Sequence, residues 1–75
     1  MTLTEAKTGK EYIVKRVDTG DEEVDAFLFS LGCYSGEPIT VVSSMKAGVV
    51  VSIKDGRYTI DHGLAGMIEI EKILW

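Results

Sequence analysis

The chain has 75 residues, of which 45% are hydrophobic and 27% are charged, and its formal net charge is -4. A chain of this size buries one small core, so we expect a single folded domain over residues 1–75. The eight basic residues are scattered, which argues against nucleic acids and anionic membrane surfaces as partners, and no apolar run approaches the roughly 20 residues of a membrane span.

The N-terminal segment "MTLTEAKTGK" has no apolar stretch of the kind found in signal peptides, so we expect a cytoplasmic protein. Cys33 is the only cysteine, which permits no internal disulfide, and no pair of Cys or His residues has the spacing of a zinc site. The Gly-Lys pair in "TGKEY" lacks the flanking residues of a phosphate-binding loop, so we interpret it as a turn before a strand.

The first predicted strand is "YIVKRV", residues 12–17. Its residues are largely β-branched, but polar and apolar positions alternate poorly along it. This pattern is typical of a strand that bends or is covered on both faces.

An amphipathic helix is predicted over residues 21–31, "DEEVDAFLFSL". Four apolar residues recur at helical spacing and are expected to face the core, namely Val24, Phe27, Leu28 and Leu31. Thr19 or Asp21 is the expected N-cap, and Gly32 fits the left-handed position after the last turn. We interpret the acidic run "DTGDEEVD" as helix capping and a solvated face, with a metal or partner site as the alternative. Phe29 lies off the apolar stripe and is either an exposed partner contact or buried against the first strand.

After Gly36 and Pro38, which shape a turn, apolar residues alternate with period two. The segments "ITVVSS" and "VVVSIK" predict strands whose inward residues are Ile39, Val41, Val49, Val51 and Ile53. Asp55-Gly56 has the composition of a type I′ hairpin turn. Pairing Lys54 with Arg57 then places Ile53 opposite Tyr58 and Val51 opposite Ile60.

The segment "HGLAGM", residues 62–67, is predicted to be a turn or one helical turn, and "IEIE" a last strand with Ile68 and Ile70 inward. For the apolar tail Lys72 to Trp75 we expect a strand extension on the core, with a partner contact as the alternative. Five short strands and one helix, placed between the first and second strands, predict a mainly β fold that closes into a small barrel.

Catalytic chemistry has little support in the sequence. Cys33 follows the helix C-terminus, where the dipole raises the pKa of a thiol, so we expect an inert packing residue. Asp61 and His62 are the candidates for metal ligands. They are weak candidates, because a lone histidine in a turn is more often solvated. We therefore expect a protein that is not an enzyme.

Three segments together resemble the ferrous iron transport protein A (FeoA) family over about residues 3–71. They are "LTEAKTGKEYIVKRV", then "LFSLGCYSGEPITVV" with the Leu31-Gly32 pair and Gly36, and then "VVVSIKDGRYTIDHGLAGMIEIE" with Asp55-Gly56 and Ala65. The chain departs from the family pattern at Ser35, where proline usually precedes the glycine, and at Cys33, where a larger apolar residue usually follows Leu-Gly. Neither departure endangers the fold.

The resemblance implies an SH3-like barrel and a small accessory protein that binds the cytosolic GTPase region of a membrane ferrous iron transporter. Its candidate contact residues are Phe29 on the helix and the turn formed by Ser35, Gly36, Glu37 and Pro38. The same barrel occurs at the C-terminal end of metal-dependent repressors, so direct binding or sensing of divalent iron, through His62 and Asp61, is the alternative function.

Overall fold

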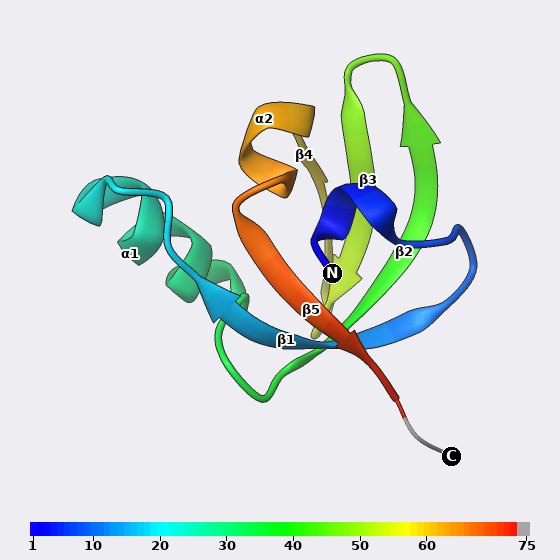
Figure 1. The fold of residues 1–75 in the computed structure, drawn as a ribbon, viewed down its shortest axis with the longest axis horizontal. Coiled ribbons are helices and arrows are strands. Elements are labelled where there is room, and N and C mark those ends of the chain that lie inside the picture. The colour runs from blue at the N-terminus through cyan, green and yellow to red at the C-terminus, as the bar shows by residue number, and fades with distance from the viewer. Residues whose placement is uncertain (74–75) are drawn as a thin grey trace.

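The computed structural model of the protein describes residues 1–73 (Figure 1). A short 3-10 helix, η1, and two α-helices accompany a curled antiparallel sheet with the strand order β4-β3-β2-β1-β5. The elements are η1 Leu3–Glu5, β1 Glu11–Val17, α1 Glu22–Leu31, β2 Pro38–Met45, β3 Gly48–Ile53, β4 Gly56–Ile60, α2 His62–Ala65 and β5 Ile68–Lys72. The predicted five strands, and the helix between the first two of them, are confirmed.

The core lies inside the curl of the sheet. Every strand residue that the period-two pattern assigned inward is buried, while Glu69 and Glu71 are exposed. The fully buried set also contains Leu3, Tyr12, Val14, Leu28, Cys33, Ile60 and Ala65. The period-two pattern therefore predicted the buried face of each strand correctly, because a strand that buries one face must place apolar residues at every second position.

Strand β1 bends, as its poor alternation predicted. Its register against β5 shifts between Val14 and Arg16, so Val17 lies opposite the buried Ile68 and packs against the core, while Ile13 on the outer face is half-buried. A bulge of this kind lets a short strand follow the curl of a small barrel.

The caps of α1 define its ends. Asp21 is the N-cap, because its carboxylate accepts a hydrogen bond from Glu23 N at 2.9 Å, and Gly32 ends the helix with a φ of +98°. The predicted apolar stripe is wrong at Phe27, which is 59% exposed. Leu28 is fully buried and Val24 and Leu31 are half-buried, so the short helix touches the curved sheet along a narrower line than the sequence pattern implies.

The β3–β4 register differs from the predicted one by two residues. Tyr58 lies opposite Val51 instead of Ile53, and Gly56 lies opposite Ile53. The turn is therefore centred on Lys54 and Asp55, and Lys54 has the positive φ of 52°. Gly56 belongs to β4, where a Cβ atom would lie 2.6 Å from Tyr58 Cζ. The missing side chain thus leaves room for the Tyr58 ring.

The N-terminal segment pairs with β5, the last strand. Thr2 bridges to Glu69, and Ile70 N donates to Met1 O at 2.8 Å, so the N-terminal segment covers the outer edge of β5. The predicted helical turn at residues 62–67 is α2. Of the tail, Lys72 belongs to β5 and Ile73 follows it, whereas the prediction for residues 74–75 lies outside the described part of the chain. Within residues 1–73, no helix has the length and apolar character needed to span a membrane.

Candidate functional site

The turn that follows α1 is fastened to the middle of β1. Gly36 N donates to Val14 O at 2.8 Å, and Val14 N donates to Glu37 O at 2.9 Å. Gly36 has a φ of +92°, which only glycine adopts without strain. These two bonds hold the backbone of the turn in one conformation beneath the end of the helix.

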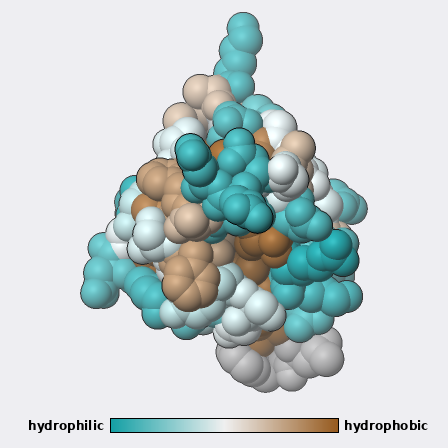
Figure 2. All heavy atoms as spheres, turned by 90° about the vertical axis from the view of Figure 1, so that its left-hand side faces the viewer, coloured by the Kyte–Doolittle hydropathy of each residue, from teal (hydrophilic) through white to brown (hydrophobic). Residues whose placement is uncertain are grey.

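An aromatic pair stands on this turn. The rings of Phe29 and Tyr34 lie 4.7 Å apart between centroids and are tilted by 31°. Phe29 is 63% exposed. Of the two alternatives that the sequence left open, an exposed ring or a ring buried against the first strand, the structure therefore shows the exposed ring. A hollow of about 330 Å³ opens beside the pair, between Lys15, Val17 and Cys33. Figure 2 shows the face on the side of α1, where apolar side chains gather near the middle and hydrophilic ones surround them.

A charged pair borders the aromatic one. Lys54 Nζ lies 3.3 Å from Glu37 Oε1 and 5.5 Å from the centre of the Tyr34 ring. Hydrogen bonds from the Tyr34 hydroxyl and from Lys54 lower the pKa of the Glu37 carboxyl, because they favour its charged form. Tyr34 and the Glu37 carboxylate in turn raise the pKa of Lys54. The carboxylate and the ammonium are therefore charged at neutral pH and held in place beside the aromatic rings.

We call this region the helix-end surface; it consists of Phe29, Tyr34, Ser35, Gly36, Glu37, Pro38 and Lys54. The structure brings the five predicted contact residues together, with Ser35, Gly36 and Pro38 exposed and Glu37 half-buried. Sequence reasoning missed Tyr34 and Lys54. Tyr34 could have been found as an aromatic residue close to the helix end. Lys54 comes from the β3–β4 turn, and no pattern in the sequence connects it with this surface.

Cys33 packs inside the protein and is not a reactive thiol. It is 1% exposed, and burial raises the pKa of its thiol to about 11. At neutral pH it is protonated, so it lacks the thiolate that nucleophilic catalysis needs. The packing interpretation of the sequence is confirmed.

Asp61 and His62 both have structural partners. Asp61 Oδ1 accepts a hydrogen bond from Leu64 N at 2.8 Å and caps α2, while His62 Nε2 lies 2.7 Å from Met45 O. Among residues 1–73, no three His, Cys, Asp or Glu side chains lie close enough together to hold a metal ion. The two residues therefore do not fit a metal ion as they are arranged.

The remaining motif residues support the fold. Ala65 is fully buried in α2 and Leu31 is half-buried on α1. A Cβ atom on Gly32 would lie 2.9 Å from Lys54 Cε, so the glycine allows the helix end and the β3–β4 turn to approach each other. These positions build the frame of the helix-end surface.

The profile of the FeoA domain family matches residues 1–72. A relative from Methanocaldococcus jannaschii, named for Fe(2+) transport protein A, is 35% identical over 69 residues, which are 92% of this chain and 83% of the relative. The resemblance found in the sequence is confirmed.

Solved structures share the fold. The crystal structure of an iron uptake regulatory protein, FeoA, is 28% identical and has a TM-score of 0.82, and the match covers 97% of this chain and 96% of that one. Stenotrophomonas maltophilia FeoA, complexed with zinc and described as an SH3 domain protein, is 20% identical with a TM-score of 0.82, covering 95% and 89% of the two chains. The fold also forms 41% of a manganese-dependent transcriptional repressor, which is 19% identical with a TM-score of 0.86 over 97% of this chain. The SH3-like fold class is thereby confirmed.

Proposed function

The chain belongs to the FeoA domain family, and from this premise we propose that it is a noncatalytic, cytoplasmic accessory protein of ferrous iron uptake. It docks on the cytosolic GTPase-containing region of a membrane ferrous iron transporter. Membership in a family associated with iron transport supports the proposed role in ferrous iron uptake. The thiol of Cys33 is buried and protonated, which argues against nucleophilic catalysis by this residue.

The observation that carries the docking proposal is the exposed aromatic ring of Phe29 on a rigid frame. The ring is 63% exposed and stacks on Tyr34, and the turn beneath it is bonded to β1. Aromatic residues are enriched among those that dominate binding energy, and a fixed frame reduces the entropy lost on association. A charged pair at the border, Lys54 with Glu37, suits the polar rim that surrounds such contacts.

The test is an NMR titration of the labelled chain with the GTPase domain of the transporter, with and without guanine nucleotide. We expect saturable shifts at Phe29, Tyr34 and Ser35. Phe29→Ala is expected to weaken binding by about 2 kcal/mol or more, or at least about thirtyfold, as for central aromatic contacts.

Phe27→Ala is the matched control. Phe27 is the same residue type on the same helix and is 59% exposed, but two residues along a helix point to nearly opposite sides. The Phe27→Ala variant should therefore bind the GTPase domain with unchanged affinity. A loss for Phe27→Ala without one for Phe29→Ala would move docking to the other side of α1, and an absence of shifts in both nucleotide states would reject the proposed partner.

Direct binding of divalent iron is the alternative function, and we do not favour it. Asp61 Oδ1 accepts a hydrogen bond from Leu64 N and His62 Nε2 contacts Met45 O, and among residues 1–73 no third His, Cys, Asp or Glu side chain joins them to complete a ligand set. Anaerobic titration with ferrous ion should leave the His62 ring resonances unchanged. Saturable broadening confined to His62 and Asp61 would restore this alternative.

A further inference from the structure

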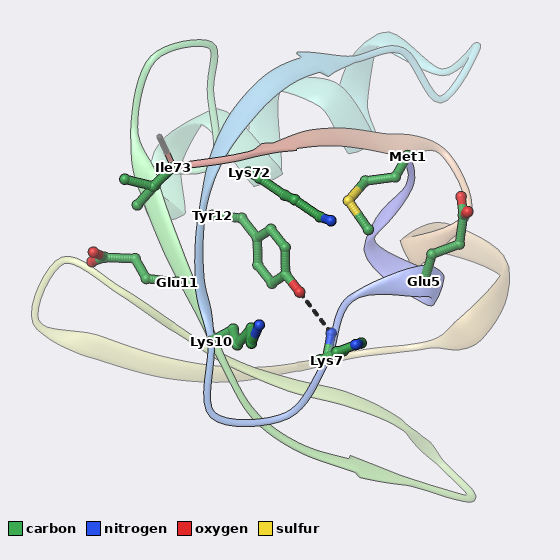
Figure 3. Close-up of a pocket in the computed structure, with 8 residues that line it drawn as sticks. All are labelled: Met1, Glu5, Lys7, Lys10, Glu11, Tyr12, Lys72 and Ile73. Atoms are coloured by element: carbon green, nitrogen blue, oxygen red, sulfur yellow. Dashed lines mark hydrogen bonds between the residues drawn. The ribbon is translucent and has the colours of Figure 1, made fainter. Parts of the chain in front are cut away.

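A second cavity lies away from the helix-end surface, beside the buried ring of Tyr12 (Figure 3). Its volume is about 220 Å³, and its walls come from β1, from the end of β5 and from the loop between η1 and β1. Ligand pockets for drug-sized molecules span about 300–1,000 Å³. This cavity therefore has room for a small ion or for one group of a larger molecule.

The cavity concentrates positive charge in a protein whose net charge is -4. Three of the eight basic residues line it, namely Lys7, Lys10 and Lys72. The strand register explains one of them, because Lys72 on β5 lies directly opposite Tyr12 on β1. In Figure 3 the side chains of Lys10 and Lys72 extend toward the space in front of the Tyr12 ring from opposite sides.

The two acidic residues of the lining do not cancel this charge. The carboxylate of Glu11 points outward, away from Tyr12, and that of Glu5 is also turned away from the cavity (Figure 3). Glu5 Oε1 instead accepts a hydrogen bond from Thr2 N at 2.9 Å. The space beside the tyrosine is thus bordered by ammonium groups with the carboxylates on the outside.

Tyr12 supplies an unused hydrogen-bond donor to this space. Its side chain is 2% exposed, and its hydroxyl oxygen accepts a hydrogen bond from Lys7 N at 2.8 Å. Among residues 1–73, the hydrogen of the hydroxyl meets no acceptor. The hydroxyl hydrogen is therefore available for donation to an anion in the cavity.

We propose that this cavity binds a phosphate group through the ammonium groups of Lys7, Lys10 and Lys72 and the hydroxyl of Tyr12. A phosphate carries about -1.5 to -2 charges at neutral pH and several strong acceptor oxygens, which matches three point charges and one directed donor. The volume favours inorganic phosphate or the terminal phosphate of a larger molecule. The proposal does not depend on docking to the transporter.

The test is an NMR titration of the full chain with sodium phosphate at constant ionic strength maintained with chloride, alongside the monoester glycerol phosphate. We expect saturable shifts of the Lys7, Tyr12 and Lys72 amides. Lys10→Gln and Lys72→Gln should each weaken binding about tenfold, the effect of removing one charge-assisted hydrogen bond.

Lys46→Gln makes the same change of charge in the β2–β3 turn, outside the cavity lining, and should leave the affinity unchanged. Tyr12→Phe keeps the ring and should weaken binding about two- to tenfold, with thermal unfolding to verify its fold. Tighter binding of the monoester would assign the site to a phosphate on a larger molecule, and tighter binding of phosphate to the free ion. Shifts that never saturate, or equal losses in Lys46→Gln and Lys72→Gln, would overturn the proposal.

Discussion

Leu28 is the side chain that attaches α1 to the barrel, and Leu28→Ala is expected to remove a large part of the stability of the protein. It is 0% exposed, while its neighbours on the helix that face the core, Val24 and Leu31, are only half-buried. Truncating a buried leucine costs about 2–5 kcal/mol, because both the transfer of its methyl groups and the cavity left behind contribute. A domain of this length has a total stability of about 4–11 kcal/mol.

The assay is urea and thermal denaturation followed by circular dichroism. A loss of about 3 kcal/mol should lower Tm by about 12–24 °C in a domain of this size. Phe27→Ala is the control, because it removes a larger side chain from the same helix turn but one that is 59% exposed, and it should change stability by no more than about 0.5 kcal/mol. A loss below about 1 kcal/mol for Leu28→Ala, or equal losses for both variants, would refute the assignment of Leu28 as the anchor.

Two further predictions concern the turn after the helix. Gly36→Ala should cost about 1–2 kcal/mol in urea denaturation through the backbone alone, because φ is +92° and no atom lies within 4 Å of the added Cβ. Gly66→Ala, at a φ of -68°, should cost nothing, and equal losses would contradict this reasoning. Burial raises the pKa of the Cys33 thiol from 9.0 to about 11, so its contribution to stability is complete below pH 9 and is lost as the pH rises toward 11. In denaturation at a series of pH values, Cys33→Ala should lose less stability between pH 9 and pH 11 than the unmodified protein. Identical pH profiles of the two proteins would refute this prediction.

The elements of the fold were predictable because each has a local physical signal. The helix carries its own end signals, and Asp21 and Gly32 cap it as expected. The strands are recognisable in the sequence because one face of each must be buried, so Ile39 and Val41 alternate with more exposed neighbours. Such signals depend on a few adjacent residues, which are present in the sequence whatever the rest of the chain does.

The errors have a different origin, since each depends on how side chains pack in three dimensions. Phe27 has the spacing of a core residue, but the curved sheet reaches only the line through Leu28. The composition of Asp55-Gly56 favours a turn, but Gly56 lies within β4, where the ring of Tyr58 occupies the space of the missing side chain. Tyr34 could not be assigned to the helix-end surface without knowing that the turn folds back on Phe29.

The two-residue difference in the β3–β4 register shows why sites are harder to predict than folds in a small barrel. A shift of two residues keeps every side chain on its face, so Val51 and Ile53 are buried in either register. It nevertheless changes which residues lie opposite each other. The cavity beside Tyr12 depends on such a pairing, because Lys72 reaches the tyrosine only in the observed β1–β5 register. The period of a sequence determines what is buried, but the register determines which polar groups meet.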